Sequence, residues 1–394
     1  MPMCAIAVTS FVLFLSTQLG VPVLPALAGQ LGADAPGMAA TLSAALMTLV
    51  LLQFFSGALA DRYGRRRVLV CGAFLGGISS LLCAVAGHWQ LLLILRILGG
   101  AADAVVMPAL LGLTAEIAEG RHGAFFGILR SSQGFSFIVA PMIGGWASIW
   151  GLRAPFVADG LLSMMACVIL AFALGEDKPL IGSGQRASQL WQLRSIFTDR
   201  RVYAFALFGI VNNFAFPILA AFVPTKAQVL GLAAPQIGTI LAAEAVTYTL
   251  GSYLAGRLSD RWGRRLFAFV AQPLIVGACL GLARSHTLFS LSVFYAVFGL
   301  GSSMTSLMSS VMIADITPDN RRATVLGAYD AAIDLVLFMA PALALALYEP
   351  LGRIQPLLLL AGVPALLALP VSWRVQETLS INRADANLCL TGGA

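Results

Sequence analysis

Long runs of hydrophobic residues, separated by short polar segments, occur along almost the whole chain. A helix needs roughly 20 apolar residues to cross the hydrocarbon core of a bilayer, and a backbone in lipid must satisfy its own hydrogen bonds. The pattern therefore predicts membrane-spanning helices. The sequence lacks the alternation of apolar and polar residues that would indicate a β-barrel. The twelve predicted spans are residues 4–27, 37–60, 68–87, 89–116, 122–146, 153–175, 202–225, 234–256, 266–283, 288–314, 323–348 and 354–374.

The composition agrees with a protein solvated by lipid. Hydrophobic residues make up 59% of the chain and charged residues 11%, whereas soluble domains carry about 25% charged residues. The net charge of +6 does not indicate a nucleic-acid partner, because most of the 24 Lys and Arg residues fall on one side if both termini are cytoplasmic. We therefore predict a multi-pass protein of the cell inner (plasma) membrane, in contact with lipid, with both termini cytoplasmic.

A strongly charged turn between hydrophobic runs occurs twice. Residues 57–66 read Gly-Ala-Leu-Ala-Asp-Arg-Tyr-Gly-Arg-Arg, and residues 256–265 read Gly-Arg-Leu-Ser-Asp-Arg-Trp-Gly-Arg-Arg. Other positions repeat at the same spacing, which predicts a parallel duplication of six helices, with substrate bound between the halves near the membrane midplane. The predicted parts are a six-helix bundle over 1–175, a cytoplasmic linker over 176–201, a second bundle over 202–375 and a loosely ordered cytoplasmic tail over 376–394.

The repeated turn has the residues of a conformational latch. An aspartate at a helix end can pair with arginines and accept hydrogen bonds from a neighbouring helix N-terminus, and such contacts can form in one conformation and break in another. A solvated anchor loop is the alternative interpretation. The predicted latch residues are Gly57, Asp61, Arg62, Gly64, Arg65, Arg66 and Glu116 in the first half, and Asp260, Arg261, Gly263, Arg264 and Asp315 in the second.

Several ionisable residues lie inside predicted spans, where charges are costly and usually functional. Arg96 and Asp103 share a helix face, with a purely structural pairing as the alternative. Repulsion between Asp330 and Asp334, one turn apart, favours protonation of one of them. The candidates for proton coupling are Arg96, Asp103, Glu244, Asp330 and Asp334. The candidates for a central cavity are Gln18, Arg130, Asn212, Asn213 and Glu244.

Other polar residues carry no predicted role. Asp159, near the end of its span, and the three histidines His88, His122 and His286 are expected to be solvated. The six cysteines are scattered without metal or redox spacing. No nucleotide-binding loop of the Gly-x4-Gly-Lys-Ser/Thr type is present. The sequence therefore predicts neither an enzyme nor a bound metal or cofactor.

The charged turn resembles motif A of the major facilitator superfamily of transporters. Leu92, Arg96 and Gly100 resemble its motif B, and residues 22–25 resemble the helix 1 motif of its twelve-helix antiporter branch. The stretch 127–145 resembles motif C of drug:proton antiporters, through Gly127, Pro141, Gly144 and Gly145. The resemblance covers residues 4 to about 375. It implies an all-α membrane protein with twelve helices in two pseudo-symmetric bundles.

The sequence departs from the family pattern in three places. Ser136 and Ala140 replace glycines of motif C, Gly99 replaces a common glutamine, and the first span has no acid. With these departures, the resemblance implies a monomer that exchanges protons for small amphipathic compounds or drugs by alternating access. Uniport or symport of a sugar, metabolite or siderophore remains open, as does a membrane sensor that does not transport.

Overall fold

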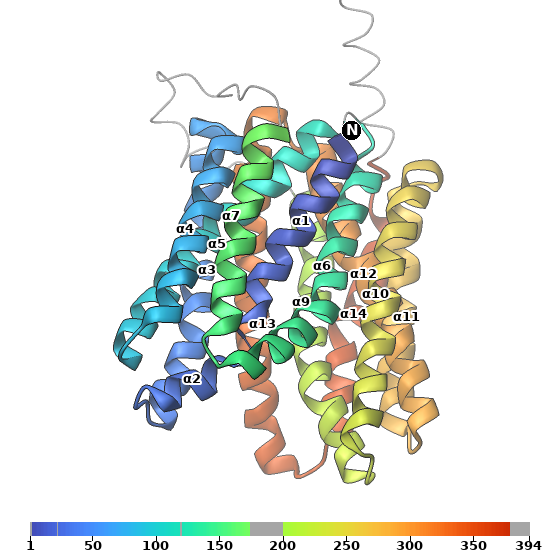
Figure 1. Cartoon of the computed structure of the whole chain (residues 1–394). Helices are drawn as coiled ribbons and strands as arrows, with labels where there is room; N and C mark the ends of the chain where they lie inside the picture. The colour runs from blue at the N-terminus through green and yellow to red at the C-terminus, as the bar shows by residue number, and fades with distance from the viewer. Residues whose placement is uncertain (1, 22, 119, 174–199, 379–394) are drawn as a thin grey trace, which may run out of the picture. The chain divides into compact units, whose positions relative to one another are not determined.

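A computed structural model describes residues 2–21, 23–118, 120–173 and 200–378 (Figure 1). The regular elements in these ranges are all helices. The predicted linker therefore lies outside the described residues, except for Arg200 and Arg201, which begin α9. The predicted tail is described only as far as Thr378.

The helices form two compact units. The first unit comprises Met1–Ile117, Phe135–Gln189 and Asp319–Ala332, and the second comprises Ala118–Gly134, Leu190–Pro318 and Ile333–Ala394. Helices of the first unit are α1 (Pro2–Leu19), α2 (Leu24–Gln30), α3 (Ala35–Tyr63), α4 (Arg65–Val85), α5 (Trp89–Ile117), η1 (Ser148–Trp150), α7 (Ala154–Ala173) and η3 (Asp319–Arg321). Those of the second are α9 (Arg200–Val229), α10 (Ala234–Trp262), α11 (Arg264–Arg284), α12 (Leu288–Ile316) and α14 (Gln355–Arg374).

Two helices contribute to both units. The first part of α6 (His122–Ala147) belongs to the second unit, and the first part of α13 (Arg322–Leu351) belongs to the first unit. Each unit therefore contains a helical segment from the other half of the sequence. The division into bundles at residues 175 and 202 remains a prediction from the sequence repeat.

The same helix pairs pack in both units. In the first unit α5 packs against α3 and α4, and α7 packs against α4 and α1. In the second unit α12 packs against α10 and α11, and α14 packs against α11 and α9. The duplicated sequence thus produces duplicated helix packing.

Ten spans in the described residues are long and apolar enough to cross a membrane. The other two predicted spans coincide with α6 and α10, which are long enough but more polar, with Arg130 and Gln133 on α6 and Glu244 on α10. The first predicted span consists of two helices, α1 and α2, with Pro25 in the first turn of α2, where a proline is tolerated because its missing N–H needs no partner.

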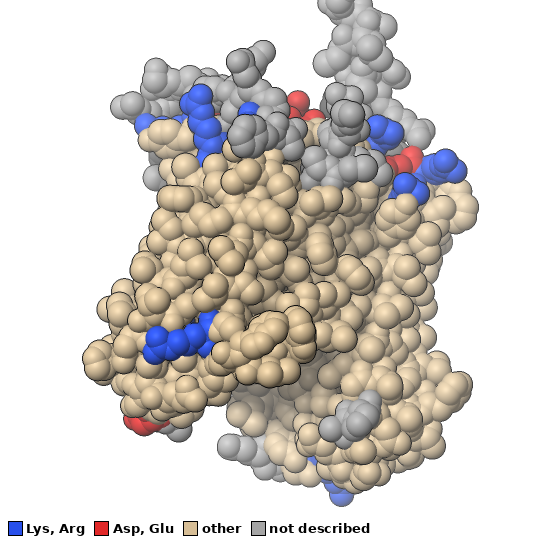
Figure 2. Space-filling model, viewed as in Figure 1, with Lys and Arg blue, Asp and Glu red and all other residues tan. Residues whose placement is uncertain are grey.

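The outer faces of the helices are apolar. Uncharged side chains cover most of the face seen in Figure 2. Leu51, Phe55 and Ile94 are each more than 60% exposed. Exposed apolar surface on this scale is unfavourable in water and suits contact with lipid.

Candidate functional site

The first copy of the charged turn ends α3 and begins α4. Gly64 joins the two helices with a φ of 99°, in the left-handed region that favours glycine. The turn places Arg65 beside Asp61, and Arg65 Nε and Nη2 donate to Asp61 Oδ1 at 3.0 and 2.9 Å. Both residues are only 1% exposed, so this ion pair is held away from water.

The second oxygen of Asp61 binds the beginning of α13. Thr324 donates its backbone N–H and its hydroxyl to Asp61 Oδ2 at 2.8 and 2.7 Å. Thr324 is in the first turn of α13, where N–H groups lack acceptors within the helix and the helix dipole favours an anion. Asp61 therefore uses both oxygens, one for a cation and one for a helix N-terminus.

Arg65 extends this contact to two further elements. Its Nη1 donates to the Gly112 carbonyl at 3.0 Å and to Glu116 Oε2 at 3.1 Å, both on α5. Its Nη2 donates to the carbonyl of Asp319 in η3. We refer to Asp61, Arg65, Glu116 and Thr324 as the first charge cluster.

Gly57 allows the helices at this cluster to approach closely. A Cβ atom built on Gly57 would lie 2.2 Å from the carbonyl oxygen of Ala323 on α13. Any larger residue at position 57 would push α3 and α13 apart. The latch glycines therefore have different roles, since Gly57 permits helix contact and Gly64 permits the turn.

The second copy of the turn builds an equivalent cluster between α10, α11 and α6. Arg264 Nη2 lies 2.6 Å from Asp260 Oδ1. The two oxygens of Asp260 accept from the backbone N–H groups of Gly123 and Ala124, at 3.0 and 2.7 Å, in the first turn of α6. Arg264 Nε also donates to Asp315 Oδ2 at 3.2 Å. The acid of each turn thus binds the N-terminus of another helix.

His122 belongs to this second cluster, so the expectation that it is solvated was wrong. Its Nδ1 lies 2.7 Å from Asp315 Oδ1, and the residue is 1% exposed. It lies next to Gly123, where α6 packs closely on α10, since a Cβ on Gly256 would lie only 2.3 Å from the Gly123 carbonyl oxygen. We refer to Asp260, Arg264, Asp315 and His122 as the second charge cluster.

The beginning of the tail also contacts the second charge cluster. Glu377 accepts from the backbone N–H groups of Arg264 and Arg265, at 2.8 and 3.1 Å. Thr378 Oγ1 donates to Asp315 Oδ2 at 2.9 Å. The expectation of loose order is therefore wrong for Glu377 and Thr378, since the first turn of α11 supplies N–H groups that require acceptors.

Three of the predicted latch arginines lie outside the two charge clusters. Arg62 is exposed and stacks over the Tyr63 ring at 4.9 Å, and Arg261 is exposed. Arg66 donates to the carbonyls of Leu170 and Ala171 near the end of α7. Gly263, like Gly64, has a positive φ, of 96°.

Gly127 and Gly144 of α6 are packing positions. A Cβ on Gly127 would lie 2.7 Å from the Ser252 carbonyl oxygen of α10, and one on Gly144 would lie 2.3 Å from the Leu19 carbonyl oxygen of α1. Gly145 has open space at its Cβ position. Pro141 lies within α6 between these contacts. The two ends of α6 therefore need small residues for contact with different neighbours.

On α5, Arg96 and Asp103 are both half-buried, and their charges act on each other. The Nε of Arg96 is buried and has no hydrogen-bond partner in the described part of the chain. Arg96 and Asp103 therefore interact through their charges, and the Nε–H group of Arg96 donates no hydrogen bond within the described residues.

In the second unit, a chain of hydrogen bonds joins α12, α9 and α13. Ser302 Oγ donates to Asn212 Oδ1. Asn212 Nδ2 then donates to Asn213 Oδ1 at 3.3 Å, and Asn213 Nδ2 donates to Asp334 Oδ1 at 3.2 Å. The structure thus connects Asn212 and Asn213, which were predicted to line a cavity, with Asp334, which was predicted to take part in proton coupling. Each amide in this chain donates toward the Asp334 carboxylate.

The other candidates occupy separate positions. Arg130 donates to Gln133 and to Ser310 of α12, both at 3.0 Å. Glu244 is buried on α10, where its charge acts on Tyr295 of α12. Asp330 is 4% exposed on the part of α13 that belongs to the first unit, and Gln18 is half-buried on α1.

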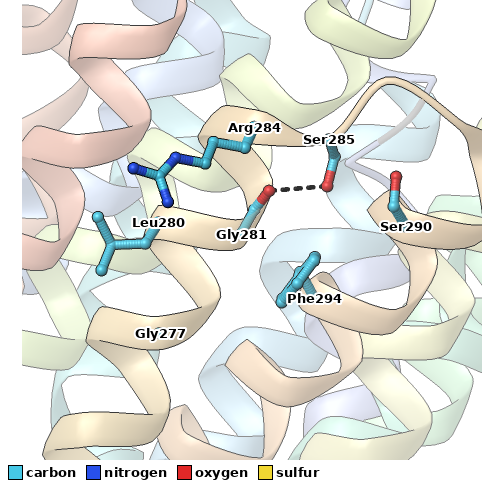
Figure 3. Close-up of a pocket in the computed structure, with 7 residues that line it drawn as sticks. All are labelled: Gly277, Leu280, Gly281, Arg284, Ser285, Ser290 and Phe294. Atoms are coloured by element: carbon cyan, nitrogen blue, oxygen red, sulfur yellow. Dashed lines mark hydrogen bonds between the residues drawn. The ribbon is translucent and has the colours of Figure 1, made fainter.

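A pocket of about 360 Å³ lies where α11 and α12 approach their connecting loop (Figure 3). Figure 3 shows Arg284 and Phe294 at this pocket, and Ser285 donates to the Gly281 carbonyl at 2.8 Å. None of the five cavity candidates lines it. The pocket is therefore separate from the residues that the sequence singles out.

Known proteins of similar sequence include an MFS-type transporter and a quinolone resistance protein. An uncharacterized MFS-type transporter of Methanocaldococcus jannaschii is 24% identical over 84% of this chain and 87% of its own length. The quinolone resistance protein NorA of Staphylococcus aureus is 29% identical over 44% of this chain and 45% of its own length.

Solved structures share the fold at low sequence identity. The human organic anion transporter MFSD10 (TETRAN) has a TM-score of 0.79 and 16% identity, over 94% of this chain and 98% of its own. The proton:xylose symporter XylE has a TM-score of 0.78 and 15% identity, over 97% and 98%. These values confirm the predicted all-α membrane fold.

The family model of the Major Facilitator Superfamily matches residues 6–232 and 205–384. Together these two matches cover most of the chain. One match contains the first half of the sequence and the other contains most of the second half. This agrees with the duplicated turn and the duplicated helix packing. The protein belongs to the Major Facilitator Superfamily and is a multi-pass membrane transporter, not an enzyme.

Proposed function

We propose that the protein exchanges protons for small amphipathic compounds, including drugs, and exports them by alternating access. The observation that carries this proposal is the duplicated charge cluster, in which a carboxylate binds the first N–H groups of another helix. Such a contact is strong while it is intact and is lost when the helices separate. It suits a latch that stabilises one of two conformations.

Proton coupling requires a carboxylate that can be charged in one state and neutral in the other. Asp103 suits this role because Arg96, on the same helix, acts on its charge, and movement of the guanidinium would change the free energy of protonation. Asp334, Asp330 and Glu244 are the competing carboxylates. The similarity to a quinolone resistance protein supports drugs as substrates.

The polar residues inside the spans give the proposed substrate site its chemistry. Asn212 and Asn213 of the second unit offer carboxamide groups, while Arg130 and Glu244 of the same unit add charge. An amphipathic substrate would place its apolar body among aliphatic side chains and its polar group against these residues. We propose that a monomer in the cell inner membrane performs this transport.

The proposal is tested with purified protein in liposomes that have an acidic lumen and contain a pH-sensitive dye. Ethidium or a fluoroquinolone added outside should enter while protons leave, so the lumen should become alkaline only when substrate is present. Substrate uptake without a proton signal would indicate a uniporter. A protein that moves neither substrate nor protons would support the sensor alternative.

The membrane orientation is predicted from the distribution of Lys and Arg. Arg121 and His286 are both exposed and lie in loops at the ends of different helices. Single cysteines at these positions, in a background without the native cysteines, should react differently with an impermeant maleimide added to intact cells. We expect labelling at position 286 only. Labelling at position 121 from outside would contradict cytoplasmic termini.

Asp260→Asn should reduce transport less than the equivalent change at Asp61. The Asp260 side chain is 13% exposed, so water can compensate part of the lost interaction. Arg264 also keeps Asp315 as a second carboxylate partner. Initial ethidium transport rates in liposomes, compared at equal protein content, measure the difference. A larger defect at Asp260 than at Asp61 would show that the second cluster is the stronger latch.

A further inference from the structure

Asp159 is a buried carboxylate on α7, although the sequence predicted that it would reach water. It is 6% exposed. It lies next to Gly160, where α7 packs closely on α4, since a Cβ on Gly160 would lie 2.5 Å from Leu81 Cγ. Burial of an ionised carboxylate is costly unless cations or several donors surround it. The partners of Asp159 therefore decide which of its protonation states this site favours.

The direct partners of Asp159 are hydroxyl groups. Ser80 Oγ of α4 donates to Asp159 Oδ2 at 2.5 Å. Ser163 Oγ lies 3.4 Å from Asp159 Oδ1 and 3.1 Å from Ser16 Oγ of α1. A serine has one hydroxyl proton, so Ser163 can donate to only one of these oxygens at a time. Among the described residues, no cation donates a hydrogen bond to Asp159.

Two charged groups on α5 act on Asp159 from a greater distance. They are Asp103, whose charge opposes that of Asp159, and Arg96, whose charge favours it. The titratable neighbour on α4 is Cys83. On the side of α1 the group at the site is the Ser16 hydroxyl. Arg153, which precedes α7, is occupied by the carbonyls of Ala84 and Ala86 at 3.1 and 2.9 Å.

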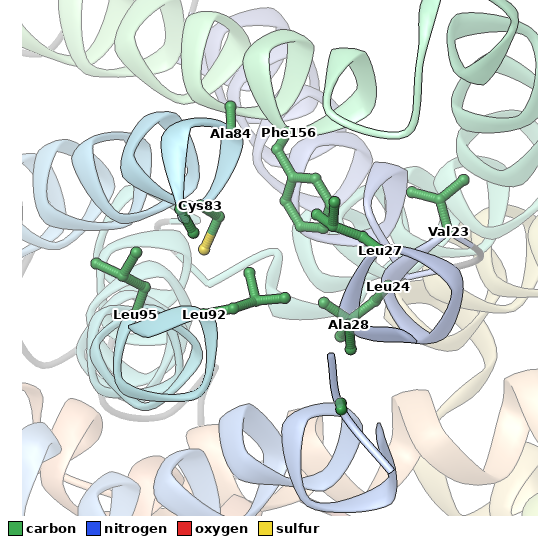
Figure 4. Packing of buried hydrophobic residues seen from close by; sticks show 11 residues of the cluster. Val23, Leu24, Leu27, Ala28, Cys83, Ala84, Leu92, Leu95 and Phe156 are labelled. Atoms are coloured by element: carbon green, nitrogen blue, oxygen red, sulfur yellow. The ribbon is translucent and has the colours of Figure 1, made fainter. Parts of the chain in front are cut away.

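An apolar cluster covers one end of this site (Figure 4). Cys83 lies one turn after Ser80, and Phe156 lies one turn before Asp159. Figure 4 shows Cys83 pointing toward Leu92 of α5 and the Phe156 ring beside Leu27 of α2. Phe156 and Leu92 are 0% exposed. One side of the site is therefore bounded by buried apolar side chains that offer Asp159 no polar partner.

The charges at the site balance when it holds one proton. Arg96 contributes one positive charge, and Asp103 and Asp159 contribute two negative charges if both are ionised. One proton makes the group neutral, which apolar surroundings favour. Because its partners are hydroxyls and it is the more buried acid, Asp159 is the carboxylate that suits the neutral form. We propose that Asp159, held by Ser80 and Ser163, binds the coupling proton in place of Asp103, an inference that rests on the proposed proton coupling.

In this scheme the proton step is a reversible binding reaction. A proton from the acidic side forms one O–H bond at a carboxylate oxygen of Asp159, leaving Arg96 and Asp103 as a charge-balanced pair. When substrate binding draws Arg96 toward Asp159, the O–H bond breaks and the proton leaves to water on the other side. Arg96 is thus shared between the two acids: it pairs with Asp103 while Asp159 is protonated, and it moves toward Asp159 when the proton leaves.

The inference is tested with Asp159→Asn in liposomes, with ethidium as the probe. Asparagine keeps the shape and an oxygen that can accept from Ser80, but it cannot exchange a proton. We expect loss of ethidium accumulation driven by a pH gradient and loss of ethidium-dependent proton release. Exchange of ethidium down its own gradient should persist, because this exchange needs no coupling proton. Proton-coupled accumulation in this variant would overturn the inference.

Two controls make the result decisive. Asp34 is an exposed acid of the same unit whose side chain caps α3 by accepting from the Gly37 N–H at 2.9 Å, so Asp34→Asn should retain coupling. If Asp159→Asn does not fold, Asp159→Glu keeps a titratable group, and the midpoint of the pH profile of proton release should move. An unchanged midpoint would also overturn the inference. If the wild-type protein shows no ethidium-dependent proton flux, the proposed function itself fails.

Discussion

Asp61→Asn is expected to lower the transport rate by roughly 100-fold while the protein still inserts in the membrane. Removing one partner of a buried ion pair costs about 3–5 kcal/mol, and a coupling of about 3 kcal/mol corresponds to a factor of about 150. The NH2 group of the asparagine, which is itself a donor, would also face donor groups of Arg65 or Thr324 in place of a carboxylate oxygen. Among the residues that the structure describes, Glu116, whose side chain is 50% exposed, would be the one carboxylate partner left to Arg65.

This expectation is measured as the initial rate of ethidium transport in liposomes, with protein content and thermal stability determined in parallel. Arg62→Gln is the matched control, since Arg62 belongs to the same turn but is exposed and lies outside the first charge cluster. It should transport at close to the wild-type rate. Wild-type turnover in Asp61→Asn would show that the turn is only an anchor, as the alternative interpretation of the sequence holds.

Asp103→Asn is expected to abolish export against a gradient and to leave exchange down a gradient possible. The change removes a titratable group inside the membrane and leaves Arg96 without the carboxylate on its own helix. Movement of the Arg96 guanidinium can then no longer change the protonation of a carboxylate at position 103. Transport would continue only in the direction of the substrate gradient, because proton binding and conformational change would be uncoupled.

The measurement compares ethidium accumulation driven by a pH gradient with ethidium exchange in its absence. Asp330→Asn and Asp334→Asn serve as the comparison, because these acids are the competing proton sites. If Asp103→Asn still concentrates ethidium while either variant on α13 does not, the coupling proton is bound on α13. The hydrogen bond from Asn213 to Asp334 would then connect protonation to α9.

Hydropathy and the repeated turn were enough to predict the helices and the fold. Apolar runs of membrane length must become helices, since no water is present to satisfy a bare backbone. Gly64 and Gly263 mark the turns because a positive φ favours glycine. The duplication also predicted that Asp61 and Asp260 would have equivalent roles, and both bind the N-terminus of another helix in the structure.

The partners of these residues were decided by the tertiary structure. A hydrophobic run determines that a helix forms, but its lipid-facing and protein-facing residues are similarly apolar, so the run does not specify which face meets which neighbour. Thr324 is 263 positions from Asp61 in the sequence, and its role depends on lying in the first turn of α13. His122 and Asp159 were expected in water, and both are buried next to close helix contacts, at Gly123 against Gly256 and at Gly160 against Leu81. By itself the sequence determined the helices and the charged turns, whereas the close approach of particular helix faces decided which charges meet.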